Sequence, residues 1–278
     1  MEKILSLQLP YDYLQEIRLA HAVAESGYEV AVESDDQIKF KQLENVFGMH
    51  FPLQKEVVPL ITDIEIRHKG SEPQTRIGHL TRSLILPHGM LDHCRSLWTD
   101  VRTIDYCFLG LVTAARKRWL SIMLRNRVSG FWGWLSKLKL QVTVNNILAK
   151  LGVSSGYIVV TATTRGRNFP VKSWDEEYYA YMASSKFVLC PSGDAGCPWT
   201  YRFFEAMLCG AIPIVETETP AYKPFYYLTK NDQQTDFLYS KEKAKANFEL
   251  CRKLLTVPKD QLLEELKRLT EVKENSNV

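Results

Sequence analysis

The sequence has little of several features that would assign it to a class at once. Its six cysteines are too sparse in 278 residues for a disulfide scaffold, and none form the CxxC pairs of a zinc ribbon or a thioredoxin-type motif. Several stand inside apolar runs, where cysteine behaves as a small hydrophobic side chain. We therefore expect reduced thiols. The sequence also contains neither GxGxxG nor the P-loop pattern GxxxxGKS/T, which argues against dinucleotide oxidoreductases and P-loop kinases.

An excess of one charge is missing as well. Lys and Arg number 35 and Asp and Glu number 32, so the formal net charge is 35 − 32 = +3. That is too small for a general nucleic-acid binder, although it is compatible with a local basic pocket for phosphate. The N-terminal apolar stretch is too short for a signal sequence, and every long apolar stretch is interrupted by charge. We expect no transmembrane segment.

The order of apolar runs predicts an α/β fold. Residues 4–9 are typical of a strand, and a helix capped by Asp12 and Gln15 follows. Residues 28–32 form the next expected strand, which completes a parallel strand–helix–strand unit. From 35 to 82 the signal is poor, with weak strands at 57–61 and 64–66 and a loop at 68–75. A short buried strand is then expected at 83–87.

A second α/β unit begins near residue 103. Strands are predicted at 106–109, 157–161, 187–190 and 212–215, and helices at 114–126, 174–184, 200–209, 242–255 and 259–272. The whole chain therefore reads as two Rossmann-like halves with a boundary near residue 100.

The most informative segment, residues 187–215, reads as a buried strand, a glycine-containing loop, a helix and another buried strand. Ligands of open α/β sheets bind beyond the carboxyl ends of the strands, where this loop lies. Gly193 lets the backbone approach a ligand, and Thr200 opens a helix whose free N–H groups favour a phosphate. Arg202 and Glu205 share one helix face, suited to a diphosphate and to ribose hydroxyls. The alternative is an ordinary surface ion pair worth about 0.5 kcal/mol.

The sequence of this segment resembles a known signature. A strand, Pro191-x-Gly193, Thr200-x-Arg202-Phe-x-Glu205-Ala and then Gly-Ala-Ile-Pro-Ile-Val is similar to the donor-binding region of the exostosin-like glycosyltransferases, family GT47. Upstream, Phe-Leu-Gly110 followed by Arg116 and Arg118 resembles that family's strand, glycine and helical arginines. The resemblance covers residues 83–240.

The resemblance implies a GT-B architecture, in which two Rossmann-like domains with parallel sheets face a cleft. It implies a reduced acceptor-side domain at 1–100 and a nucleotide-sugar-binding domain at 101–240. Amphipathic helices at 241–278 would pack on the domains. Because the chain is short for the family and shows no membrane anchor, it suits a cytoplasmic microbial or viral enzyme rather than a Golgi-anchored one.

The implied activity is inverting transfer of a sugar from a UDP-sugar to a hydroxyl of an oligosaccharide or glycoprotein glycan, with no metal or other cofactor. Xylose is the favoured sugar, because Pro198 and Trp199 would narrow the pocket. The leaving diphosphate needs cations in place of a metal, and Arg116, Arg118 and Arg202 are the candidates. Asp35-Asp36 is interpreted as a solvated turn rather than a metal site.

The predicted donor-site residues are Gly110, Arg116, Arg118, Arg165, Pro191, Gly193, Thr200, Arg202 and Glu205. Arg165 and its neighbour Arg167 follow a strand and would lie near a uracil or phosphate; the alternative is a solvated polar loop. The aromatic and basic run at 125–134 is either an acceptor or membrane contact or a helix that simply packs.

The acceptor hydroxyl must lose a proton during the reaction. All six histidines precede residue 94, so a histidine base would come from the first half of the chain. His88 follows the strand expected at 83–87, with Asp92 close by, and both are candidate catalytic residues. The alternative for His88 is a turn histidine bound to backbone. A second function remains open: a nucleotide-binding or glycan-binding module that keeps the fold without turnover.

Overall fold

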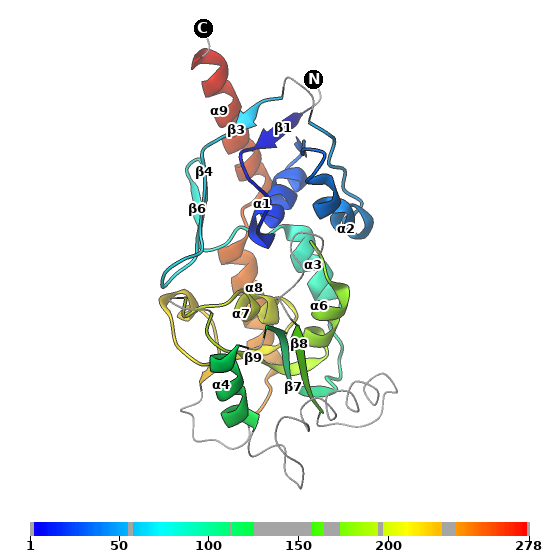
Figure 1. Cartoon of the computed structure of the whole chain (residues 1–278), viewed down its shortest axis with the longest axis vertical. Helices are drawn as coiled ribbons and strands as arrows, with labels where there is room; N and C mark the ends of the chain where they lie inside the picture. Colours follow the sequence, from blue (N-terminus) through cyan, green and yellow to red (C-terminus); the bar gives the residue numbers. More distant parts are fainter. Residues whose placement is uncertain are drawn as a thin grey trace. The chain divides into compact units, whose positions relative to one another are not determined.

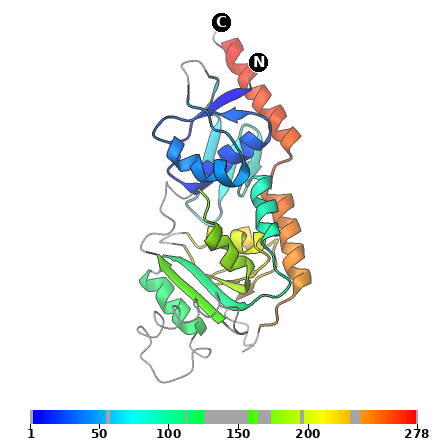
Figure 2. The same ribbon diagram turned by 90° about the vertical axis from the view of Figure 1, so that its right-hand side faces the viewer.

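The computed structural model describes residues 3–54, 58–111, 113–124, 157–163, 173–193, 197–229 and 237–276. The chain divides into two compact units (Figures 1 and 2). Unit 1 comprises Met1–His93, Asn168–Asp175 and Arg252–Val278, and unit 2 comprises Cys94–Arg167 and Glu176–Cys251. The predicted segments were 1–100, 101–240 and 241–278. The first crossing between the units instead follows His93, and the last residues, from Arg252 on, belong to unit 1.

Unit 1 contains a small parallel sheet with strand order β2-β1-β3. Its elements are β1 (Ile4–Leu7), α1 (Leu14–Glu25), β2 (Glu29–Val30), α2 (Gln37–Phe47) and β3 (Leu60–Ile61). Helix α1 starts one residue later than predicted: the N–H of Tyr13 donates to Glu16 at 3.0 Å, whereas Gln15 donates to the carbonyl of Ile85 at 2.9 Å.

An antiparallel meander and two helices complete unit 1. They are β4 (Ile64–Arg67), β5 (Gln74–Ile77), β6 (Leu80–Arg82), α3 (His88–Ser96) and α9 (Lys259–Ser276). The strand predicted at 83–87 is wrong. These residues are largely buried, but the chain has left the meander, and the N–H of Leu86 donates to Leu255 at 2.7 Å. An apolar run marks burial, and here burial comes without sheet pairing.

Unit 2 is built on a five-stranded parallel sheet. The strands are β7 (Ile104–Leu111), β8 (Tyr157–Thr163), β9 (Ser185–Cys190), β10 (Ile212–Val215) and β11 (Leu228–Thr229). The helices are α4 (Ala114–Leu124), α6 (Glu176–Ala183), α7 (Tyr201–Leu208), the short η1 (Pro220–Tyr222) and most of α8 (Lys241–Leu255). The predicted α/β class, with a parallel sheet in each unit, is confirmed.

The strand order of unit 2 contains a topological switch point. The order is β11-β10-β9-β7-β8, so the chain runs from β7 to β8 on one side and then crosses to β9 on the other side of β7. A crevice forms where strand order reverses, beyond the carboxyl ends of the strands, and ligands of open α/β sheets bind there. By this rule, a ligand of this sheet is expected beyond the carboxyl ends of β7 and β9.

A buried arginine ties the helices of unit 2 together at the other end of the sheet. Arg102 is 8% exposed, and its guanidinium donates to the carbonyls of Ala183 at 2.8 Å, Ser185 at 2.7 Å and Cys209 at 3.0 Å. These carbonyls belong to the end of α6, the start of β9 and the end of α7. Arg102 therefore fixes where α7 ends, without any carboxylate in those bonds.

We expect Arg102→Met to destabilise unit 2 by about 3 kcal/mol, because several buried carbonyls would lose their donor. Thermal and urea unfolding measure this. Arg95→Met is the matched control, since Arg95 also lies over Trp98, at 4.1 Å, but is exposed. Equal stability of the two variants would contradict the role given to Arg102.

In unit 1, Glu25 caps helix α3. Its carboxylate accepts the N–H groups of His88 and Gly89, both at 2.7 Å, and lies 3.0 Å from Nε2 of His21. Burial by itself raises the pKa of the Glu25 carboxyl, but the bonds from His21 and Gly89 outweigh it and hold the pKa below its usual value. The carboxylate form is thus favoured by folding.

A carboxyl whose pKa is lower in the folded state contributes stability that is present above its unfolded pKa and lost as pH falls through its folded pKa. We expect Glu25→Gln to be less stable than wild type by about 1–2 kcal/mol at pH 7. The difference should shrink below about pH 4.5. Unfolding across a pH series, with the exposed Glu29→Gln as control, measures it; a difference independent of pH would refute the cap's ionic character.

Candidate functional site

The carboxyl ends of β7 and β9 meet at the switch point of unit 2, and helix α7 begins beside them. β7 ends at Leu111, and β9 ends at Cys190, where the buried Pro191 takes the chain into the predicted loop. β9 and β10 are paired in parallel up to Cys190 and Val215, so the residues after these strands also lie side by side. The predicted donor-site segment therefore lies at the position that the sheet topology favours.

Arg202 is fixed against β7. Its Nε donates to the carbonyl of Leu109 at 2.9 Å, and its guanidinium lies 4.3 Å from the centre of the Phe108 ring. Gly110 makes this approach possible, because a Cβ there would collide with Nη2 of Arg202, and Gly110 has a φ of 150°. The predicted pair Gly110 and Arg202 is thus brought into direct contact.

Arg116 joins the two strand ends across the switch point. From α4, its Nε donates to the carbonyl of Ser192 and its Nη1 to that of Leu111, both at 3.1 Å. Arg118, two residues further along α4, is exposed. Of the three predicted cations, Arg116 and Arg202 lie at the switch point, and Arg118 lies on an exposed part of its helix.

Glu205 is not part of a surface ion pair, because it is only 1% exposed. The hydroxyl of Tyr178 on α6 donates to Oε2 of Glu205 at 2.6 Å. Arg202 and Glu205, three residues apart, thus have different neighbours: β7 for the arginine and α6 for the glutamate. Tyr178 was missed as a site residue, since its partner lies 27 positions away and neither residue marks the other in sequence.

The backbone N–H of Thr200, the residue that precedes α7, has a partner within the protein. That N–H donates to the hydroxyl of Tyr222 at 2.7 Å. The Tyr222 ring stacks on Phe203 with centroids 3.6 Å apart, and burial raises the pKa of its hydroxyl, which keeps the proton. Thr200 does precede α7, as predicted, but a protein hydroxyl occupies its donor.

Gly193 is packed closely within its own loop. A Cβ on Gly193 would lie 2.6 Å from the carbonyl oxygen of Cys197 and 2.9 Å from that of Trp199. The close approach is therefore to the loop's own backbone. Gly193 shapes the loop, and the adjacent Ser192 is the residue whose backbone groups are engaged by side chains.

Two residues after β10 were missed by sequence reasoning. Glu216 accepts the backbone N–H of Ser192 at 3.0 Å, and Thr217 accepts the Ser192 hydroxyl at 3.0 Å. The signal that could have found them is the parallel pairing of β9 and β10. Because Cys190 lies opposite Val215, the residues that follow β10 lie beside those that follow β9. Arg165, Arg167 and the aromatic run at 125–134 lie outside the described residues.

In unit 1, His88 is the first residue of α3 rather than part of a turn. Its Nε2 lies 2.9 Å from the carbonyl of Val257. Since a carbonyl only accepts, Nε2 is the donor in this bond, and in the neutral imidazole the lone pair is then on Nδ1. Asp92, one turn on, accepts a bond from Arg252 at 2.9 Å. Asp36 pairs with Lys39 at 2.6 Å beside the start of α2.

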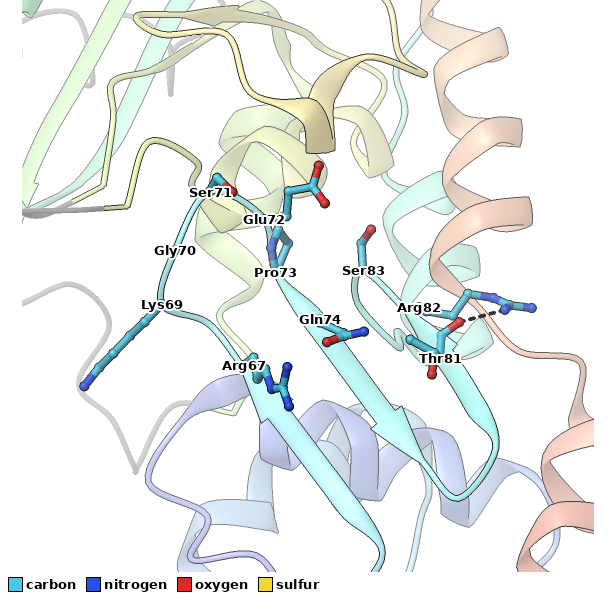
Figure 3. Close-up of a pocket in the computed structure, with 10 residues that line it drawn as sticks. All are labelled: Arg67, Lys69, Gly70, Ser71, Glu72, Pro73, Gln74, Thr81, Arg82 and Ser83. Carbon is cyan, nitrogen blue, oxygen red and sulfur yellow. Dashed lines mark hydrogen bonds between the residues drawn. The ribbon is translucent and has the colours of Figure 1, made fainter.

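Unit 1 also carries a polar cavity of about 520 Å³ on the meander (Figure 3). Its lining is polar or charged apart from one glycine and one proline: Arg67, Lys69, Gly70, Ser71, Glu72, Pro73, Gln74, Thr81, Arg82 and Ser83. Lys69 extends away from the others, and Arg82 donates to the carbonyl of Thr81 at 2.9 Å. Hydroxyl, amide and guanidinium groups together suit a hydroxyl-rich ligand.

Across the described ranges, no group of three or more His, Cys, Asp or Glu side chains could hold a metal ion. The described helices also include none that is both long and apolar enough to cross a membrane. No disulfide joins any of the six cysteines, all of which are described, and burial raises the pKa of the Cys107 thiol to about 12.

Residues 112–246 match the family model of the RXYLT1 C-terminal domain, an exostosin-related and GT47-related xylosyltransferase domain. The match spans just under half of the chain and makes this segment similar to a GT47-related glycosyltransferase domain. The matched segment contains β9, α7, β10 and Arg116, and β7 precedes it directly. The resemblance found in the sequence is therefore confirmed at the level of the family. No curated protein matches the chain in sequence.

Three solved structures show weak likeness to the chain. A GtfA/B complex has a TM-score of 0.36 at 11% identity and covers 95% of this chain, which spans about half (48%) of that one. A glycosyltransferase from Rickettsia africae has a TM-score of 0.34 at 10% identity, covering 98% and 71%. Anabaena Alr3699/HepE in complex with UDP and glucose has a TM-score of 0.27 at 11% identity, and the match covers 99% of this chain and 71% of that one. All three TM-scores are below 0.5, so the α/β assignment rests on the described sheets.

Proposed function

We propose that the chain is an inverting glycosyltransferase that moves a sugar from a UDP-sugar to a hydroxyl of a glycan. The observation that carries the proposal is the pair of arginines at the switch point of unit 2. Arg116 and Arg202 donate to backbone carbonyls, and these bonds hold both guanidinium groups at the ends of β7 and β9. Two fixed positive charges beyond the strand ends are suited to a diphosphate.

The reaction would be a single displacement at the anomeric carbon. The acceptor oxygen forms a bond to that carbon while the bond to the diphosphate breaks, and the electron pair leaves with UDP. The departing diphosphate gains negative charge, which Arg116 and Arg202 would stabilise as preorganised cations. We propose that this happens without a metal or other cofactor, the two guanidinium groups taking the role of the cation.

Glu205 is proposed to bind the ribose. Its carboxylate already accepts one hydroxyl, that of Tyr178, and a carboxylate has acceptor sites for several hydroxyl groups. At 1% exposure, the carboxylate becomes accessible only when the residues covering it move, so binding would include a local rearrangement. Pro191, Gly193 and Thr200 would shape the loop around the nucleotide, and Arg165 and Arg118 remain candidate contacts.

The acceptor side is proposed to lie in unit 1. The polar cavity on the meander offers Gln74, Glu72 and hydroxyl groups for the hydroxyls of an oligosaccharide or glycoprotein glycan. His88 is proposed as the base: its Nε2 is held by a carbonyl, and Nδ1 would take the acceptor proton. Asp92 is proposed to act near it. Xylose is the proposed sugar, in keeping with the xylosyltransferase domain that residues 112–246 match.

The alternative function is a nucleotide-binding or glycan-binding module without turnover. The observation that favours it is the engagement of several donors by protein groups, such as the Thr200 N–H by Tyr222. Such a module would bind UDP and yet release none from a UDP-sugar in the presence of a glycan. Measuring UDP release with a panel of sugars and glycans therefore separates the two functions.

We expect UDP compounds, and not GDP, CMP or ADP, to raise the unfolding temperature of the protein. At about 100 times the dissociation constant, a ligand contributes about 2.7 kcal/mol, a shift of a few degrees. Arg202→Ala should abolish most of this shift and of any turnover while remaining folded. Lys245→Ala, which removes one exposed positive charge from α8, should keep both. Normal turnover of Arg202→Ala would refute the donor site.

Two variants test unit 1 in a transfer assay. Gln74→Ala should raise the KM for the glycan about tenfold with a small effect on kcat, because it removes an uncharged contact to the acceptor. His88→Ala should instead lower kcat by about 100-fold or more, as expected for a general base. The exposed Gln261→Ala serves as control. Full kcat in His88→Ala would remove His88 from the mechanism.

A further inference from the structure

Ser192, the second residue after β9, has all three of its polar groups held by side chains. Its N–H donates to Oε2 of Glu216 at 3.0 Å, its hydroxyl donates to Thr217 at 3.0 Å, and its carbonyl accepts from Arg116 at 3.1 Å. Glu216 and Arg116 thus bind the N–H and the carbonyl of the same residue, in the loop where the diphosphate is proposed to bind. The Ser192 N–H, a donor that could bind a phosphate, is thus already bonded to an anion, the Glu216 carboxylate.

The pairing of β9 with β10 places Glu216 beside Ser192. β9 and β10 pair in parallel with Cys190 opposite Val215, and Glu216 is the first residue beyond β10. Its side chain is exposed, and within the described residues Ser192 is the partner to which it is bonded, so the contact can be exchanged for another anion. A carboxylate carries one negative charge, whereas a diphosphate carries more and has more acceptor oxygens for the same donors.

We propose that the Glu216 carboxylate occupies the position of a donor phosphate and must leave it when the nucleotide binds. This inference rests on the proposed nucleotide-sugar site. With a nucleotide bound, the displaced carboxylate stands close to the diphosphate and repels it. After transfer the diphosphate of UDP carries the extra negative charge, and the return of Glu216 to the Ser192 N–H would favour its release. Glu216 thus sets nucleotide affinity and product release rather than bond making.

The test compares Glu216→Gln with Glu218→Gln by calorimetry. Both substitutions remove one exposed negative charge from the same loop, but only Glu216 is bonded to Ser192. We expect Glu216→Gln to bind UDP and inorganic pyrophosphate roughly fivefold more tightly than wild type, the range expected for an exposed charged contact. Glu218→Gln should differ little, and the affinity for uridine should not change, since uridine has no phosphate.

Each other outcome has one meaning. Wild-type binding of UDP with no gain in Glu216→Gln, or an equal gain in Glu218→Gln, would overturn this inference and leave the proposed function standing. Weaker binding in Glu216→Gln would show that the carboxylate braces the loop instead. If wild type and both variants bind neither UDP nor pyrophosphate, the proposed function fails, and the inference that rests on it fails too.

Discussion

Backbone carbonyls that receive their donors from arginine guanidinium groups determine how unit 2 is put together. Arg102 donates to carbonyls at the ends of α6 and α7 and at the start of β9. Arg116 donates to carbonyls at the strand ends of the switch point, and Arg202, from α7, donates to a carbonyl of β7. Helix α7 is thereby fixed at both ends. A backbone carbonyl carries no net charge, so the bonds that stabilise the fold do not themselves neutralise the guanidinium groups at the ends of β7 and β9.

Much of this site follows from local sequence. The apolar runs of β9 and β10, the loop between them and the helix with Arg202 and Glu205 are all marked within about thirty residues, and the structure contains each of them. The partners of these residues are not marked. Tyr178, Tyr222 and Glu216 act on residues 27, 22 and 24 positions away, and only the folded sheet brings them together. Sequence therefore identifies the charged groups better than the groups that hold them.

Unit 1 shows where periodicity is a weak guide. The apolar residues at 84–86 are buried without strand pairing, because the chain there packs on its own C-terminal segment. Helix α2 was missed because only Phe40 and Leu43 are buried in it, which leaves its apolar stripe thin. In the meander, β4 was expected as a weak strand at 64–66, whereas β5 and β6 were missed because each is short and has a single large apolar residue. Both errors arise where few apolar side chains are needed to cover a small sheet.

The contact between Gly110 and Arg202 links two positions that are 92 residues apart. Two constraints act at 110: a Cβ would collide with Nη2 of Arg202, and the φ of 150° is one that L side chains rarely adopt. The first constraint depends on the flexible end of Arg202, whereas the second belongs to the backbone of β7 itself. Among descendants of this sequence, glycine at 110 should therefore outlast the arginine at 202.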